Sequence, residues 1–130
     1  MVVLMGKSRR ADVMLAIAVV VCLFAPGSIH GRAQAPETKV MEIDAERFSF
    51  TPSELRIAAG ATVELRIRSH DTNHGFRIIG TDINAIVPKR GRGTATVMFR
   101  PEKPGRYVFE CTKLCGAGHS FMRGVIVVSE

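Results

Sequence analysis

The chain has 130 residues, with 18 Lys or Arg against 12 Asp or Glu and a formal net charge of +6 at pH 7. This length fits a single domain. The sequence contains no Ser/His/Asp array, paired-carboxylate site or Gly-rich phosphate loop, so it gives no support to hydrolytic or phosphoryl chemistry.

The first 35 residues have the pattern of a secretory signal peptide. They combine a basic region at 7–10, an apolar segment at 13–24 and the small-x-small sequence Ala33-Gln34-Ala35. The apolar segment is shorter than the ~18–20 residues that a membrane-spanning helix needs. We therefore expect cleavage after Ala35 and export to the periplasm or another extracytoplasmic compartment. An uncleaved N-terminal membrane anchor is the alternative.

The mature domain predicted in this way covers residues 36–130. Its Lys plus Arg count falls from 18 to 14 and its Asp plus Glu count from 12 to 11, so the formal charge is +3. A net charge of this size influences solubility and association rather than fold. It gives little reason to expect a nucleic-acid partner.

From Val40 onward, apolar and polar residues alternate with a period of two, which is typical of half-buried β-strands. The clearest alternation lies at 63–68, and no sustained helical period follows. Residues 81–93 are the least regular segment, where a helical turn is expected at most. Seven or so short strands separated by turn signals predict an all-β fold, a Greek-key β-sandwich.

The segment Cys111-Thr-Lys-Leu-Cys115-Gly-Ala-Gly-His119-Ser-Phe-Met122 gathers two thiols, an imidazole and a thioether. Such soft or borderline ligands favour copper over calcium, magnesium or manganese. Two cysteines in an exported domain ordinarily indicate a disulfide, but the His and Met that follow favour a metal site. His74, in an expected loop between two strands, is a further candidate ligand. A mononuclear blue-copper site needs two His, one Cys and a weak Met, so this chain offers one thiolate more.

The spacing Cys-x3-Cys-x3-His-x2-Met, with Gly116 after the second Cys and Ser120 after the His, resembles a known copper loop. It is similar to the loop of the binuclear CuA centre in cytochrome c oxidase subunit II. The segment Asp71-x-x-His74-x-Phe76 is similar to the one that carries that family's other histidine ligand. The resemblance implies a cupredoxin-like fold and a copper-binding electron carrier rather than an enzyme.

The resemblance also implies a ligand set for two copper ions. Two thiolates would bridge both ions, one imidazole would complete each, and a thioether and a backbone carbonyl would be weak ligands. These residues are Cys111 and Cys115, His74 and His119, Met122, and Lys113 through its carbonyl.

The chain departs from that family at three points. Lys113 stands where the family usually has an acidic residue, which removes a carboxylate but keeps a backbone carbonyl. The sequence has no Trp, so the family's aromatic entry point for electrons from cytochrome c is missing. The paired transmembrane helices of a full subunit II are also missing. We therefore expect a free-standing exported domain whose partner is a c-type cytochrome or a terminal oxidase or reductase.

Three other functions remain open at this point. The same ligands could serve a periplasmic copper carrier or metallation factor, or a mononuclear type 1 copper protein. The domain could also be an electron-entry subunit of a cytochrome c oxidase.

Four further features carry expectations of their own. His70 lacks a matching motif position and is expected to be a solvated loop residue or a neighbour of a ligand. Phe76 and Phe121 are expected to be buried, as apolar walls of the metal site or as core aromatics. The basic cluster Lys89-Arg90-Gly91-Arg92 is expected to be a solvated loop, with docking to an acidic redox partner as the alternative.

Overall fold

The alternating sequence folds into β-strands over the part of the chain that the computed structural model describes, residues 37–130. These residues belong to one compact unit, Gln34–Glu130. The expected signal peptide, residues 1–35, lies outside the described residues. Within residues 37–130, no helix has the length and hydrophobicity needed to cross a membrane.

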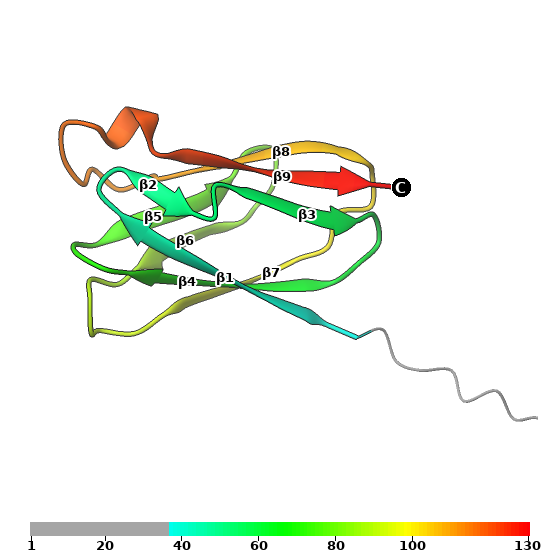
Figure 1. Cartoon of the computed structure of the whole chain (residues 1–130), viewed down its shortest axis with the longest axis horizontal. Helices are drawn as coiled ribbons and strands as arrows, with labels where there is room; N and C mark the ends of the chain where they lie inside the picture. Colours follow the sequence, from blue (N-terminus) through cyan, green and yellow to red (C-terminus); the bar gives the residue numbers. More distant parts are fainter. Residues whose placement is uncertain (1–36) are drawn as a thin grey trace, which may run out of the picture. The chain divides into compact units, whose positions relative to one another are not determined.

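The strands of the described region form two sheets that pack face to face (Figure 1). The four-stranded sheet has the order β2-β1-β4-β7, with strands Ser49–Thr51, Lys39–Glu46, Val63–Ser69 and Ala95–Phe99. The five-stranded sheet has the order β3-β9-β8-β5-β6, with strands Glu54–Ala58, Arg123–Ser129, Gly105–Glu110, His74–Ile78 and Asn84–Val87. Both sheets are mixed, because β1 runs parallel to β4 and β3 runs parallel to β9. The predicted all-β sandwich is confirmed.

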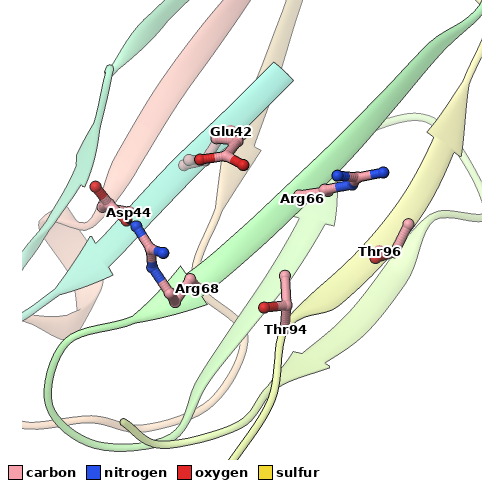
Figure 2. A pocket seen from close by; sticks show the side chains of 7 residues that line it. Glu42, Asp44, Arg66, Arg68, Thr94 and Thr96 are labelled. Atoms are coloured by element: carbon pink, nitrogen blue, oxygen red, sulfur yellow. Dashed lines mark hydrogen bonds and ion pairs between the residues drawn. The ribbon is translucent and has the colours of Figure 1, made fainter. Parts of the chain in front are cut away.

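The period of two in the sequence separates the core from the solvent. In β4, Val63, Leu65 and Ile67 are buried between the sheets, whereas the side chains between them point outward. On the outer face, Arg66 pairs with Glu64 at 2.6 Å, and Arg68 pairs with the carboxylate of β1 residue Asp44 at 3.1 Å. Both arginines and Asp44 line a shallow pocket on this face, together with Glu42 and two threonines, Thr94 and Thr96 (Figure 2).

An aromatic cluster fills the core below one end of the sandwich. Phe50, Phe76 and Phe109 contact one another with ring centroids 5.2 to 5.9 Å apart. Phe76 lies two residues after His74 in the same strand, and Phe109 lies two residues before Cys111. Since residues i and i+2 of a strand share a face, this cluster fixes the direction of the strands that supply the candidate ligands.

The expected helical turn within residues 81–93 is wrong. Asn84–Val87 forms strand β6, which pairs antiparallel with β5 at the edge of the five-stranded sheet. An edge strand can leave apolar side chains in solvent, and Ile86 is 61% exposed. Apolar residues therefore fall on both faces of β6, which removes the alternation that would have identified it.

Candidate metal centre

The loop that joins β8 to β9 lies at one end of the sandwich and carries the Cys/His/Met segment (Figure 1). β8 ends at Glu110, the short 3-10 helix η2 follows at His119–Phe121, and β9 begins at Arg123. A backbone hydrogen bond of 3.0 Å from the N–H of Cys111 to the carbonyl of Met122 closes the base of the loop. The two ends of the segment are therefore held side by side.

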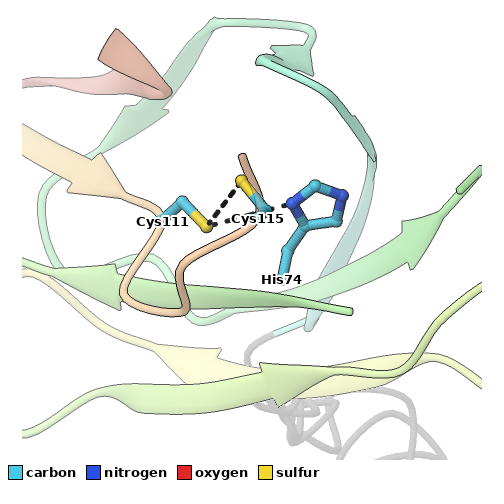
Figure 3. Close-up of side chains that lie close together, drawn as sticks. All are labelled: His74, Cys111 and Cys115. Carbon is cyan, nitrogen blue, oxygen red and sulfur yellow. Dashed lines mark hydrogen bonds between the residues drawn. The ribbon is translucent and has the colours of Figure 1, made fainter. Parts of the chain in front are cut away.

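The two cysteines of this loop face each other in the protein interior. The Sγ atoms of Cys111 and Cys115 lie 3.9 Å apart, and both thiols are free and buried. His74 is fully buried at the start of β5 and points toward them from the neighbouring strand (Figure 3). The predicted polar loop around His74 is wrong at this residue, because the strand begins at His74 itself.

Cys111 is the centre of one group of donors. Its Sγ lies 3.9 Å from Nδ1 of His74 and 3.2 Å from the carbonyl oxygen of Lys113. The N–H of Gly75 points to the same sulfur at 3.5 Å. A Cβ atom on Gly75 would lie 2.9 Å from the backbone nitrogen of Lys113 and closer still to Oγ1 of Thr112. Only glycine therefore lets β5 approach the cysteine loop this closely.

Cys115 is the centre of a second group. Its Sγ lies 3.7 Å from Nδ1 of His119 and 3.9 Å from Sδ of Met122. Positions i and i+3 of a 3-10 helix eclipse each other, so His119 and Met122 face the same sulfur from η2 and its C-cap. The structure therefore brings every predicted ligand position to one end of the sandwich.

Two residues outside the predicted ligand set hold the ligand segments. Oδ1 of Asp71 lies 2.7 Å from Nε2 of His74, and the backbone N–H of Arg47 donates to Oδ2 of Asp71 at 3.0 Å. Burial opposes ionisation of Asp71, but hydrogen bonds from His74 and from the backbone of Arg47 and Thr72 lower its pKa to about 2. The position of Asp71 three residues before His74 was an available signal, whereas no sequence pattern pointed to Arg47.

Burial raises the pKa of the Cys115 thiol above its ordinary value, and the adjacent Cys111 raises it further. Cys115 is therefore protonated at neutral pH in the metal-free protein, and a bound metal must displace that proton. A pocket of about 210 Å³ adjoins the donors, lined by Glu110, Cys111, His119, Ser120, Met122 and Arg123. Part of the donor set thus borders open space rather than packed side chains.

The two aromatic residues expected around the metal behave differently. Phe76 is fully buried, as predicted, whereas Phe121 is 81% exposed, so the prediction of burial is wrong for Phe121. The turn of η2 explains the difference. With three residues per turn, His119 and Met122 take the inward direction, and Phe121 must point to another side of the helix.

Neither His70 nor the basic cluster contributes a donor to the two groups. His70 lies at the surface, with Nε2 2.8 Å from Oδ1 of Asp44, which agrees with a solvated loop residue. The cluster 89–92 is an exposed turn, as expected. Its backbone nevertheless contacts the loop before His74: the N–H of Lys89 donates to Oδ1 of Asn73 at 2.8 Å.

These features define a β-sandwich metal protein with a buried, sulfur-rich site at one end. The match to the cupredoxin-like domain covers residues 13–128, and the chain belongs to this family. The soft donor set fits copper. Together with family membership, it supports copper binding and an electron-transfer role for the domain.

The relatives of the chain include cytochrome c oxidase subunit 2. One such protein of Thermus thermophilus is 34% identical over 96 residues, which cover 73% of this chain and 69% of that relative. A second subunit 2 of the same species matches at the same identity, but over only 55% of its length. The resemblance to subunit II that the ligand motif indicated is confirmed.

Solved structures share the fold at lower identity. The periplasmic domain of cytochrome oxidase subunit II of Bradyrhizobium japonicum aligns with a TM-score of 0.65 and 17% identity, covering 73% of this chain and 87% of that one. Auracyanin A, a blue copper protein of Chloroflexus aurantiacus, aligns with a TM-score of 0.59 and 20% identity, covering 72% of this chain and 100% of that one.

Proposed function

We propose that this domain is an electron carrier with a binuclear copper centre of the CuA type, bridged by Cys111 and Cys115. One observation carries the proposal: the other donors divide into two groups, one around each sulfur. The group at Cys111 consists of the His74 imidazole and the Lys113 carbonyl, and the group at Cys115 consists of the His119 imidazole and the Met122 thioether.

A mononuclear type 1 site would use this arrangement incompletely. Such a site takes two imidazoles, one thiolate and a weak thioether. The second buried thiol, which has an imidazole of its own beside it, would then bind no metal. Two copper ions would use both cysteines, both imidazoles and both weak donors.

The chain supplies what such a centre needs for electron transfer. When bound, two thiolate-bridged copper ions exchange one electron with little change of geometry. Phe76, two residues after His74 in the same strand and fully buried, would help to keep water from the metal, which limits reorganisation. The contact of Asp71 with Nε2 of His74 leaves Nδ1 free to face the metal.

The test is the copper content and the electron paramagnetic resonance spectrum of the domain covering residues 36–130. We expect two copper ions per chain and a spectrum in which one unpaired electron is shared by two copper nuclei. One copper ion with a mononuclear spectrum would overturn the proposal. Ready transfer of the copper to a metal-free acceptor, without reversible redox cycling, would indicate a copper carrier instead.

We place the docking surface for the redox partner at the same end of the sandwich. Two apolar side chains of the ligand loop stand in solvent there, since Leu114 is 80% and Phe121 is 81% exposed. Lys113 and Arg123 flank them, and the basic cluster 89–92 lies beside the loop that precedes His74. This surface suits an acidic redox protein, either a c-type cytochrome or a terminal oxidase or reductase.

Ionic strength tests this assignment with small redox reagents of opposite charge. Oxidation by an anionic reagent should slow as salt rises, whereas oxidation by a cationic reagent should not. Replacing Lys89 and Arg92 with Glu should weaken the salt dependence for the anionic reagent. If salt changed the oxidation rates by both reagents equally, the electrostatic argument for an acidic redox partner would be wrong.

A second form of this proposal is that the domain is the electron-entry subunit of a cytochrome c oxidase. The observation that favours it is the identity of the relatives as oxidase subunits 2, of which the chain covers 69% and 55%. Co-purification with haem-copper subunits from the native host tests it. Isolation of the domain with a soluble cytochrome instead would favour the free carrier.

We also propose that residues 1–35 direct export and are removed. The sequence pattern supports cleavage after Ala35, although Pro36 after the cleaved bond can shift the site to a neighbouring position. In an oxidising compartment the two thiols, 3.9 Å apart, can form a disulfide that competes with copper. Assembly should therefore need a thiol reductant, a copper donor or both. N-terminal sequencing of protein from the native host tests export, and an intact Met1 on cytoplasmic protein would contradict it.

A further inference from the structure

The turn between β1 and β2 contacts both segments that supply the candidate ligands. The Nε–H of Arg47 donates a hydrogen bond of 2.7 Å to the carbonyl oxygen of Cys115. The backbone N–H of Arg47 donates to Oδ2 of Asp71 at 3.0 Å, and Oδ1 of the same carboxylate lies 2.7 Å from Nε2 of His74. One residue outside the ligand segments thus connects the cysteine loop with the support of the buried histidine.

The neighbouring residue, Phe48, covers the cysteine loop. A Cβ atom on Gly116 would lie 2.8 Å from Cε1 of the Phe48 ring, and one on Gly118 would lie 3.0 Å from Cε2 and closer still to Cγ. The φ angle of Gly116 is also +143°, a backbone conformation that residues other than glycine rarely adopt. The ring therefore packs directly on the backbone between Cys115 and His119.

The charge of Arg47 is directed at this loop. Arg66 and Arg68 lie on the outer face of the same sheet (Figure 2). Arg66 pairs with Glu64, and Arg68 pairs with Asp44. Among the ion pairs of residues 37–130, none includes the Arg47 side chain. Its guanidinium group instead donates a hydrogen bond to the backbone of a candidate ligand, and such bonds from charged donors are stronger than neutral ones.

We propose that Arg47 is a positioning residue for the copper site and that Arg47 and Phe48 together form a clamp on the cysteine loop. The clamp holds Cys115 and the segment that leads to His119 in place before metal binds. This inference rests on the proposed copper-binding function. Because a preorganised loop does not need to be ordered on metal binding, the clamp should speed copper insertion and slow copper loss.

Amide hydrogen exchange in the reduced, metal-free domain tests the clamp without copper. Arg47→Gln should raise exchange rates over residues 112–121 by about tenfold, the scale set by one hydrogen bond from a charged donor. Arg47→Lys keeps a charged donor and should give a smaller increase. The matched control is Arg66→Gln, which removes an exposed arginine on the outer face and should leave the loop unchanged (Figure 2).

Wild-type exchange over residues 112–121 in Arg47→Gln, with circular dichroism showing a folded domain, would overturn the proposal. Gly118→Ala tests the same clamp from the loop side if Arg47→Gln fails to fold. The added methyl group must displace Phe48, so loop exchange should rise in this variant too. Unchanged exchange in a folded Gly118→Ala domain would also contradict the clamp.

The copper-loaded domain supplies a second readout. Arg47→Gln should lose copper to a chelator about tenfold faster than wild type and show altered copper hyperfine structure. Wild-type rates and spectra in this variant would contradict a positioning role. The two proposals fail separately: a wild-type domain that binds no copper refutes the proposed function, and the exchange experiment still decides whether the clamp exists.

Discussion

Nε2 of His74 lies 2.7 Å from Oδ1 of Asp71, and this contact determines which ring nitrogen faces the thiols. The low pKa of Asp71, about 2, keeps the carboxylate ionised at neutral pH. Because an ionised carboxylate only accepts hydrogen bonds, Nε2 carries a hydrogen, and Nδ1 is the ring nitrogen that faces Cys111, 3.9 Å away. A carboxylate behind a ligating histidine orients the ring and raises its basicity.

Asp71→Ala should weaken copper binding by roughly 10- to 100-fold, the usual effect of removing a carboxylate behind a ligating histidine. Competition with a chelator of known affinity measures this change. The chain offers a matched control, because Asp44 makes a similar contact of 2.8 Å with His70, which belongs to neither donor group. Asp44→Ala should bind copper as wild type does, and equal losses in the two variants would refute the specific role of Asp71.

Cys115→Ser should abolish the copper centre, whereas Met122→Leu should keep copper and change the reduction potential. A bridging thiolate holds the metal, while a thioether is a weak ligand that only tunes it. Leu fills nearly the volume of the buried Met122 side chain, so the fold should tolerate the change. Copper analysis and a redox titration measure the two effects, with Met98→Leu at an exposed position as the control. Equal copper loss in both variants would contradict the assignment of Met122 as a weak ligand.

Acid should reveal the contribution of Asp71 to the stability of the metal-free domain. Its pKa falls from the ordinary value of 3.8 to about 2 on folding, so the ionised carboxylate stabilises the fold above pH 3.8. This contribution is lost as the pH falls through about 2. The free energy of unfolding of wild type relative to Asp71→Asn should therefore decline across this window in urea titrations. A constant difference between the two proteins would mean that Asp71 is not stabilised as an anion.

Copper affinity should fall as the pH falls. The raised pKa of Cys115 means that copper must displace a proton from this thiol throughout the neutral range. Proton release on binding can be measured by calorimetry in buffers of different ionisation enthalpy. Cys115→Ser removes that proton, and if it still bound copper with the same proton release, Cys115 would not be a ligand.

The parts of the fold set by local alternation could be predicted from the sequence. Val63, Leu65 and Ile67 define β4 because one face of the strand is buried and the other is in solvent. The ligand loop could also be predicted from the sequence, because its donors lie close together in one segment and their spacing indicates a metal site.

Features that depend on distant contacts or on backbone direction could not be predicted in this way. Arg47 reaches Cys115 only because the β1–β2 turn folds over the cysteine loop, and no local pattern encodes that approach. The orientation of Phe121 depends on the three-residue period of η2, which the sequence does not reveal in so short a segment. β6 stayed hidden because its exposed Ile86 breaks the expected alternation.

The different environments of Phe76 and Phe121 lead to opposite expectations for the same substitution. Phe76 is fully buried and packs against Phe50 and Phe109, so Phe76→Ala should lower the free energy of unfolding by about 3–5 kcal/mol. Phe121 is 81% exposed, so Phe121→Ala should change the free energy of unfolding by no more than about 0.5 kcal/mol.

Urea unfolding of the metal-free domain measures both changes, and a redox titration of the copper-loaded Phe121→Ala variant completes the test. Because Phe121 does not shield the site from water, the reduction potential of this variant should stay at the wild-type value. Its electron exchange with a physiological partner should slow instead, since Phe121 lies on the proposed docking surface. A large loss of stability or a shifted reduction potential in Phe121→Ala would contradict the exposed position of Phe121 and indicate that this side chain packs inside the copper site.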